Sequence, residues 1–266
     1  MVDLRFLRGE PHPGLRADLG AYVGYVERVD RPLVRREVAG GRCVLIVGWG
    51  APIDIADPRG ASHGVRGVAS FTGGLSDSYV DTYNAGVGQG IQLMLDPLVA
   101  GRLLGVPLGE LANRVVALDD LGARDFKELP ERLALAPSWP ARFALLDDVF
   151  GRRLDEAPPT DPRLARIWAR LDATHGRIPI ERLAAEVGWS RRHLATVANR
   201  ELGLAPKVLA RMLRFGRAYG MRDRAATQGW AAVAAECGYY DQAHLIRDFH
   251  AFAGTTPAAS VSSNPG

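Results

Sequence analysis

Short apolar runs alternate with turn-forming residues over the first third of the chain. Runs of four to eight mostly apolar residues, bounded by Gly, Pro and Asp, are typical of β-strands. Five runs fit this description: residues 22–29, 43–49, 52–56, 65–72 and 91–95. The pattern predicts a β-rich unit that extends to about residue 95.

A glycine-rich segment, Gly86-Val-Gly88-Gln-Gly90, precedes the last of these runs. It resembles a phosphate-binding loop, but no Lys-Ser or Lys-Thr pair follows it. The glycine spacing also fits neither nucleotide-binding fingerprint. We therefore interpret residues 86–90 as a turn that leads into the strand at 91–95.

From residue 97 onward, the apolar positions are spaced as in helices. Ser138 can cap a helix that carries Pro140 in its first turn, and Phe143, Leu146 and Phe150 then fall on one face. This spacing predicts a helix that packs on the β-rich unit.

Residues 156–162 contain three prolines, which stop a helix and favour an extended connector. We place the boundary between two domains here, each long enough to bury a core of its own. The N-terminal domain spans 1–155, β-rich to about 95 and helical over 97–155. The second domain spans 161–260.

Residues 180–202 contain two helical patterns separated by a very short break. Their apolar faces are Ile180, Leu183, Ala184 and Val187 in the first, and Leu194, Val197, Ala198 and Leu202 in the second. Gly188 suits a left-handed C-cap, and Ser190 can cap the second helix. Two short amphipathic helices joined by a tight glycine turn predict a helix-turn-helix unit.

The same plan recurs about fifty residues later. The two apolar faces are Trp230, Val233, Ala234 and Cys237, and then Leu245, Phe249 and Phe252. Gly238 stands where Gly188 stood, and Asp241 can cap the second helix. A single pattern of this kind occurs in many helical hairpins, so the repetition is what makes the prediction specific.

A helix that starts near Pro206 connects the two units. Its inward positions are Leu209, Met212 and Leu213, and its outward positions are Arg211, Arg214 and Arg217. A helix of about 15 residues is roughly 22 Å long. It can hold two recognition helices near the roughly 34 Å that separates successive major-groove faces of DNA. We interpret the three outward arginines as solvated or next to phosphates, rather than as base contacts.

The charge of the chain is unevenly distributed. The net charge is +3, but residues 161–266 carry 15 Lys and Arg against 9 Asp and Glu, whereas residues 1–160 carry 18 against 21. A basic half joined to a mildly acidic half indicates a polyanionic partner for the basic half. An excess of this size also fits a solvated surface, so it supports the doubled motif without replacing it.

Residues that enzymes and metal sites need are not grouped in the sequence. Cys43 and Cys237 are the only cysteines and lie far apart, and the two histidines before residue 156 are isolated. Neither an HExxH nor a GxSxG motif is present. We therefore predict no catalytic residue, no metal ion and no cofactor, and a Cys43 that is buried and inert.

The chain contains no apolar stretch long enough to cross a membrane. Its first ten residues mix charged and apolar types and lack the apolar centre of a signal peptide. Sparse, unpaired cysteines suit a reducing compartment. These features predict a cytoplasmic protein without a membrane partner.

Two segments resemble the DNA-binding region of AraC/XylS-type regulators: IPIERLAAEVGWSRRHLATVANRELGLAP and GWAAVAAECGYYDQAHLIRDFHAFAGTTPAA. The resemblance covers about residues 164–260. It implies a bipartite, seven-helix DNA-binding domain preceded by a sensing or dimerisation domain. We therefore expect an α+β protein: a β-rich N-terminal domain with a helical segment, followed by an all-α domain with two helix-turn-helix units.

The resemblance also implies which side chains face DNA. The positions are Arg191, Arg192 and Thr196 in the first recognition helix, and Gln242, His244 and Arg247 in the second. The outward faces of the same helices add Arg200 and His250. The plainer interpretation is a solvated helix start for Arg191 and Arg192, and a capping or packing role for the two histidines.

These features predict a sequence-specific transcription regulator that binds the major groove of double-stranded DNA. We expect the N-terminal domain to sense a small-molecule effector, to form a homodimer, or both; an activator would also contact RNA polymerase. Two alternatives stay open. The N-terminal half could be an enzyme or a covalent sensor fused to the DNA-binding module, or an interaction platform without a ligand.

Overall fold

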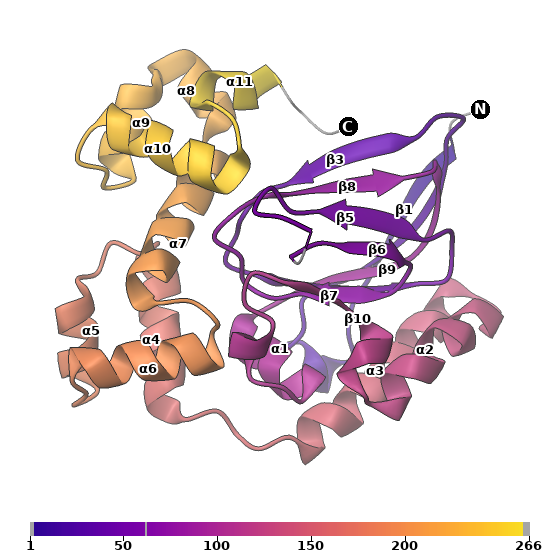
Figure 1. Cartoon of the computed structure of the whole chain (residues 1–266). Helices are drawn as coiled ribbons and strands as arrows, with labels where there is room; N and C mark the ends of the chain where they lie inside the picture. The colour runs from indigo at the N-terminus through magenta and orange to yellow at the C-terminus, as the bar shows by residue number, and fades with distance from the viewer. Residues whose placement is uncertain (1–2, 62, 263–266) are drawn as a thin grey trace.

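A computed structural model describes residues 3–61 and 63–262. Within this part of the chain, residues 3–156, here the N-terminal region, form two β-sheets and a group of helices. Residues 162–262, here the C-terminal region, fold into helices beside the sheets (Figure 1). The α+β class and the order of a β-rich part before an all-helical part are as predicted.

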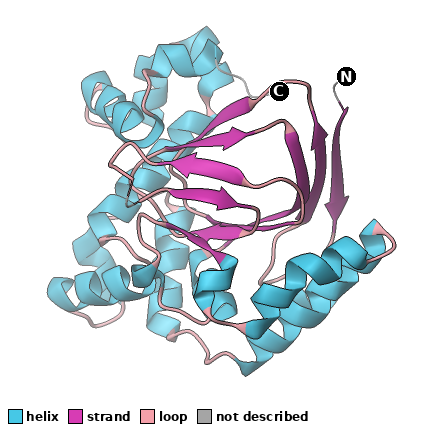
Figure 2. Ribbon diagram, turned by 45° about the vertical axis from the view of Figure 1, so that its right-hand side comes forward, coloured by secondary structure: helices cyan, strands magenta, loops and turns pink. Residues whose placement is uncertain are grey.

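The strands of the N-terminal region form two antiparallel sheets that face each other (Figure 2). The six-stranded sheet has, in spatial order, β1 (Asp3–Gly9), β2 (Tyr22–Arg28), β9 (Val87–Leu95), β4 (Cys43–Gly48), β7 (Phe71–Gly73) and β10 (Val115–Ala117). The four-stranded sheet has β3 (Leu33–Glu37), β8 (Val80–Asn84), β5 (Ile53–Ala56) and β6 (Val65–Val68).

The alternation of side chains along β4 shows how the six-stranded sheet is used. Cys43, Leu45 and Val47 are fully buried on its outer face. Val44 and Ile46 point to the opposite face and line a cavity between the sheets. Both faces of this strand are apolar because one packs against helices and the other forms the wall of the cavity.

Three helices of the N-terminal region contribute to the core against that outer face: α1 (Pro97–Leu104), α2 (Arg124–Leu135) and α3 (Trp139–Glu156). Short 3₁₀ turns lie at η1 (Pro13–Leu15), η2 (Leu108–Glu110) and η3 (Leu118–Leu121). The Ser138 side chain accepts a hydrogen bond from the Ala141 amide, which confirms the predicted cap of α3. Leu146 and Phe150 are fully buried, and Phe143 packs against the same core, as predicted.

The C-terminal region consists of eight helices within the described residues. They are α4 (Pro162–Ala173), α5 (Ile180–Glu186), α6 (Arg191–Glu201), α7 (Pro206–Gly220), α8 (Arg222–Gln228), α9 (Trp230–Glu236), α10 (Gln242–Ala253) and α11 (Pro257–Ser262). In Figure 1, α7 runs between a lower group (α4 to α6) and an upper group (α8 to α11). None of the helices among residues 3–61 and 63–262 is long and apolar enough to cross a membrane.

Strands occur at all five predicted positions, with two corrections. The run at 65–72 is two strands, because the chain leaves the four-stranded sheet after β6 and enters the six-stranded sheet at β7. Ser70 marks the crossing: its hydroxyl accepts from the Gly48 amide and donates to the Gly48 carbonyl. The interpretation of residues 86–90 as a turn is wrong beyond Gly86, because β9 begins at Val87.

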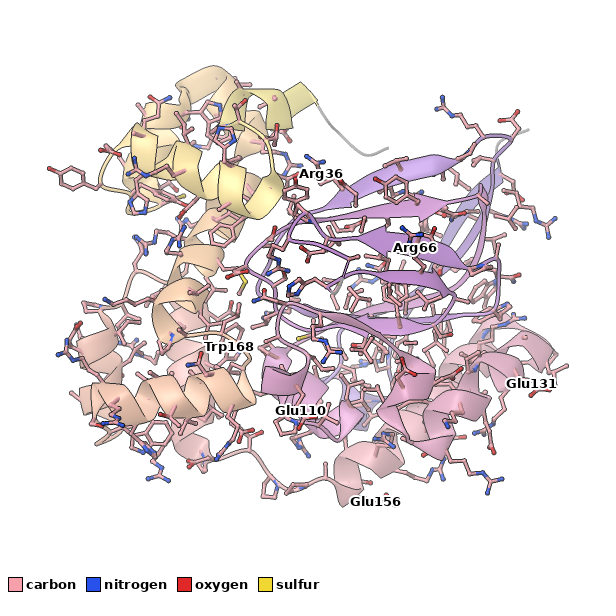
Figure 3. All side chains as sticks on the ribbon, viewed as in Figure 1. Arg36, Arg66, Glu110, Glu131, Glu156 and Trp168 are labelled. Atoms are coloured by element: carbon pink, nitrogen blue, oxygen red, sulfur yellow. The ribbon has the colours of Figure 1, made fainter. Side chains whose placement is uncertain are left out.

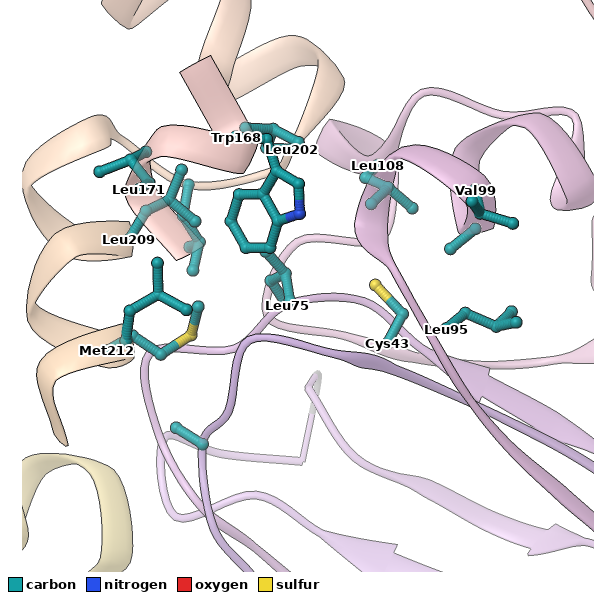
Figure 4. Packing of buried hydrophobic residues seen from close by; sticks show 14 of the residues in the cluster. Cys43, Leu75, Leu95, Val99, Leu108, Trp168, Leu171, Leu202, Leu209 and Met212 are labelled. Carbon is teal, nitrogen blue, oxygen red and sulfur yellow. The ribbon is translucent and has the colours of Figure 1, made fainter. Parts of the chain in front are cut away.

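The hydrophobic core does not divide at the boundary between the regions, contrary to the expectation of two separate cores. One cluster of buried residues joins Leu75 and Cys43 to Trp168 of α4 and Met212 of α7 (Figure 4). Trp168 also donates its indole N–H to Asp96 at 2.6 Å. Burial raises the pKa of the Cys43 thiol to about 12, in agreement with the predicted inert cysteine.

Candidate DNA-binding surface

The first helix-turn-helix unit consists of α5 and α6. Gly188 between them has φ +69°, the left-handed conformation that glycine adopts at lowest cost. The Ser190 hydroxyl accepts from the His193 amide at 3.1 Å and caps α6. Leu183 of α5 and Leu194 of α6 are buried between the helices. Both local signals in the sequence therefore have the predicted structural role.

The second unit consists of α9 and α10 and repeats this geometry. Gly238 has φ +77°, and the Asp241 carboxylate accepts from the His244 amide at 2.7 Å. The repeat extends to the end of each recognition helix. Gly203 follows α6 with φ +86°, and Gly254 follows α10 with φ +63°. We refer to these two positions as the terminal glycines.

The outward face of α6 is exposed, although Thr196 and Arg200 also line a cleft between α6 and the N-terminal region. Arg191, Arg192, Thr196 and Arg200 are all exposed. Arg191 pairs with Glu181 at 3.1 Å, and its side chain is 72% exposed. An exposed ion pair contributes little stability, so this guanidinium can leave Glu181 for a phosphate or a base edge. Thr196 donates its hydroxyl hydrogen to the Arg192 carbonyl along the helix.

The outward face of α10 is exposed at Gln242, Arg247 and His250 but not at His244. The His244 ring is half-buried and packs edge-on against Tyr239, with ring centroids 5.1 Å apart. Its Nε2 lies 4.0 Å from an Asp248 carboxylate oxygen. His244 therefore packs against its neighbours with part of its ring, as in the plainer interpretation. The rest of the ring is accessible in a groove beside α7.

The arginines of α7 differ from the interpretation as a solvated face. Arg211 donates to the Asp248 carboxylate at 2.6 Å, and Arg217 donates to Glu236 at 3.2 Å. Asp248 is only 1% exposed, whereas Arg211 is 42% exposed. These contacts tie α10 and α9 to the connecting helix. Asp248 and its partner are 37 residues apart in sequence, and no local pattern predicts such a pair.

The N-terminal region contacts the carboxyl ends of both recognition helices. A Cβ at Gly109 of η2 would lie 2.8 Å from the Asn199 carbonyl oxygen, so the backbones of η2 and α6 are in direct contact. At α10, the Ala39 amide donates to the Phe252 carbonyl at 3.0 Å, and Arg36 donates to the Gly254 carbonyl at 3.3 Å. Figure 3 shows Arg36 beside this end of the upper helical group.

The two sheets enclose a cavity of about 330 Å³. Ile46, Ile55 and Phe71 are among its apolar lining residues. At its polar side, the Glu27 carboxylate accepts from the Arg35 guanidinium at 2.7 Å and from the Asn84 amide at 3.1 Å. Cavities of this size, mostly apolar with a few polar groups, are typical of small-molecule sites.

One side of the cavity is formed by the segment that touches α10. Val38, Ala39, Gly40 and Arg42 line the cavity, and Ala39 is the donor to Phe252. Burial raises the pKa of Glu37, which also lines the cavity. The cavity wall and the end of the second recognition helix therefore share one short segment of backbone.

A profile described as a helix-turn-helix domain matches residues 183–261. These residues include both units described above. The C-terminal region is therefore a helix-turn-helix DNA-binding domain with two units, and the chain is a DNA-binding transcription regulator.

The whole chain is similar in fold to solved structures of ToxT from Vibrio cholerae. An apo variant of ToxT has 8% identity and a TM-score of 0.52, covering 91% of this chain and 97% of that chain. ToxT bound to (E)-4-(8-methylnaphthalen-1-yl)but-3-enoic acid has 9% identity and a TM-score of 0.52, covering 91% and 98%. At such identities the likeness shows a shared fold. A search of curated proteins finds no match.

Within residues 3–61 and 63–262, no group of three or more His, Cys, Asp or Glu side chains is arranged to hold a metal ion. The polar outward faces of α6 and α10 form the candidate DNA-binding surface.

Proposed function

We propose that this regulator reads two successive major-groove segments of one duplex, with α6 in the first and α10 in the second. The observation that supports this most directly is the repeated geometry: two recognition helices with matched caps, both ending on the side of the N-terminal region (Figure 1). We take residues 161–260 as the DNA-binding domain and 1–155 as the domain that controls it.

In this proposal, exposed arginines make the charged contacts of both recognition helices with DNA. Arg191, Arg192 and Arg200 of α6, and Arg247 of α10, bind phosphates or guanine edges, to which arginine can donate two hydrogen bonds. Gln242 can form a bidentate pair with adenine, and the Thr196 hydroxyl can donate to or accept from a base edge. His244 and His250 donate hydrogen bonds from ring nitrogens.

Selection of binding sites from a random duplex library tests this proposal. The full-length protein should enrich a site with two blocks about one helical turn apart. Arg192→Ala and Arg247→Ala should each cost about 1–3 kcal/mol of binding free energy and relax the preference in one block only. The matched control is Arg124→Ala on α2, an exposed arginine paired to Glu128 in the N-terminal region.

Two results would contradict the proposal. One is the absence of any enriched site for the full-length protein at low salt. The other is a loss of preference in both blocks when a single recognition helix is altered, because that would mean that α6 and α10 do not read separate segments.

We further propose that a small molecule in the cavity between the sheets controls DNA binding, with no catalytic step. The support is the shared segment: Val38, Ala39, Gly40 and Arg42 line the cavity, and the Ala39 amide donates a hydrogen bond to the end of α10. ToxT, which has the same fold, binds an arylbutenoic acid. The regulator acts in the cytoplasm as a homodimer, and contacts RNA polymerase if it activates transcription.

Thermal stabilisation by the arylbutenoic acid that ToxT binds is a direct test of the cavity. A ligand that binds only the folded state raises the unfolding temperature. Ile46→Trp, which fills the cavity from β4, should abolish that rise while DNA binding persists. A rise that survives this substitution would place the ligand elsewhere. Conversion of the ligand to a product would favour the enzyme alternative.

A further inference from the structure

A groove rich in cations lies between the two helix-turn-helix units. It has a volume of about 510 Å³ and is bounded by the segment that leads into α5, by one side of α7, and by the turn and first residues of α10 in the second unit. Its charged and titratable lining residues are Arg177, Lys207, Arg211, Arg214 and His244. No acidic side chain lines it among the described residues.

Most of this positive charge is not neutralised inside the protein. Arg211 pairs with Asp248. Lys207 makes no hydrogen bond or close ion pair with any described residue, and Arg177 donates only to the Thr174 carbonyl. Arg214 donates to the Gly238 carbonyl, and its Nε is buried without a hydrogen-bond partner. The groove therefore has hydrogen-bond donors with unused capacity.

The groove lies on the same side of α7 as the candidate DNA contacts. A backbone hydrogen bond, the Arg191 guanidinium and the charge of Lys207 all lower the pKa of the Glu181 carboxyl, so Lys207 lies near the start of the first recognition helix. His244, on the second recognition helix, lines the groove itself. Arg177, which precedes the first unit, reaches to within 3.1 Å of where a Cβ of Gly238 would lie.

This location determines what would cover the groove in a DNA complex. When two recognition helices occupy successive major-groove segments on one face of a duplex, the minor groove between them faces the connector. The two sugar-phosphate strands that border this minor groove then pass over α7. Phosphates are the only anionic groups of DNA, and Lys and Arg that neutralise them release condensed counterions.

We infer that this groove is a phosphate-binding site, in which Arg177 and Lys207 hold the DNA backbone midway between the two base-reading segments. The inference rests on the proposed bipartite DNA binding and adds a third, sequence-independent point of attachment. It also gives a reason for two cations, Arg177 and Lys207, that form no close ion pair with a described carboxylate.

The salt dependence of DNA binding measures this site. Each lost phosphate contact should reduce the slope of log affinity against log salt by about 0.9. Arg177→Ala and Lys207→Ala should each do so, the double variant should lose about 1.8, and the affinity for any duplex should fall by a similar factor. Arg124→Ala, which removes one exposed cation on α2, should leave the slope unchanged.

Phosphate ethylation interference locates the contact on DNA. With the full-length protein, ethylation of phosphates between the two blocks should inhibit binding, and the double variant should lose this central interference while keeping that in both blocks. A wild-type slope in both single variants, or no central interference with the unmodified protein, would overturn the inference.

If the proposed function fails, these experiments give a different result from a failure of the phosphate site. If no sequence-specific site exists, the two-block interference pattern is missing altogether. The slope on a random duplex still tests the groove in that case, because phosphate binding requires no base recognition. An unchanged circular dichroism spectrum of both exposed-residue variants excludes misfolding as the cause of a changed slope.

Discussion

The two helix-turn-helix units share a backbone plan but differ in how they are held. In the first unit, α6 ends against η2, where Gly109 allows the two backbones to touch. In the second unit, the Arg211–Asp248 pair ties α10 to α7, and hydrogen bonds from Arg36 and Ala39 hold its carboxyl end. The first contact is steric, whereas the second is polar.

Because they are held differently, the two units differ in how much their outward surfaces can change. Among the described residues, the only ion pair that an outward arginine of α6 makes with α5, Arg191–Glu181, is exposed and contributes little stability, so this surface can vary without loss of fold. In α10, by contrast, Asp248 on the inner side is buried, and His244 on the outer side lies 4.0 Å from it. The orientation of α10 is therefore fixed by more polar contacts than that of α6. α10 is also the recognition helix in direct contact with the cavity wall.

Both terminal glycines touch the N-terminal region. A Cβ at Gly203 would lie 2.9 Å from the Leu108 carbonyl oxygen, and one at Gly254 would lie 2.2 Å from the Tyr79 ring. Since the two glycines are equivalent in the repeat, the N-terminal region contacts each recognition helix at the same position, just after its carboxyl end. We expect this double contact to restrict the distance between them.

The largest expected effect comes from removing the ion pair between Arg211 and Asp248, which joins α10 to α7. Arg211→Ala leaves the buried Asp248 carboxylate without its guanidinium. Removal of one partner of a buried pair costs about 3–5 kcal/mol, and the partial exposure of Arg211 favours the lower end, about 3 kcal/mol. Urea unfolding of the full-length protein measures this loss.

The matched variant in the first unit is Arg191→Ala, which breaks an exposed pair with Glu181. It should change the free energy of unfolding by less than about 0.5 kcal/mol. Arg211→Met combined with Asp248→Leu should recover most of the lost stability, because it removes the uncompensated charge. Equal losses for Arg211→Ala and Arg191→Ala would mean that the two units are held alike.

A smaller effect is expected from overpacking the contact between η2 and α6 in the first unit. Gly109→Ala places a methyl group against the Asn199 and Arg200 backbone, and overpacking of this kind costs about 1–3 kcal/mol. We expect lower stability and a broader tolerance for the spacing between the two DNA blocks. Gly216→Ala on α7, where a Cβ meets nothing within 4 Å, is the control.

The spacing assay distinguishes steric support from simple destabilisation. If Gly109→Ala lowers the unfolding free energy but keeps the wild-type spacing preference, the contact with η2 does not restrict the recognition helices. A broader spacing preference with retained affinity for each single block would support the double contact.

What the sequence predicts about this molecule is mostly local. The caps at Ser190 and Asp241 and the turns at Gly188 and Gly238 depend on residues within a few positions of each other, so spacing alone identifies them. The pair Arg211–Asp248 and the contact Trp168–Asp96 join residues 37 and 72 positions apart. No periodicity encodes such contacts, and they become visible only when the helices are packed.

Strand prediction failed for a related reason. β1, β3 and β8 were missed, because their composition does not show an apolar run. β10, Val-Val-Ala, is apolar but only three residues long, and it corrects the prediction that residues 97–155 are helical throughout. β3 reads Leu-Val-Arg-Arg-Glu, and its Arg35 faces a cavity rather than a packed core. A strand that lines a polar-sided cavity does not need the apolar alternation that marks a strand on a hydrophobic core. The cationic groove was missed because its residues come from three separate segments.

The smallest expected effect concerns the two helix caps, which differ in charge. Ser190→Ala and Asp241→Ala each remove a side-chain acceptor and should each cost about 1 kcal/mol. Asp241 also places a negative charge at the positive end of α10, which adds about 0.3–1 kcal/mol at low salt. Asp241→Asn keeps the acceptor but removes the charge, so it should lose only this second contribution, and high salt should reduce the difference. If Asp241→Asn matches wild type at low salt, the second cap is no stronger than the first, and the tighter hold on α10 must come from Arg211 and the segment at 36–39 alone.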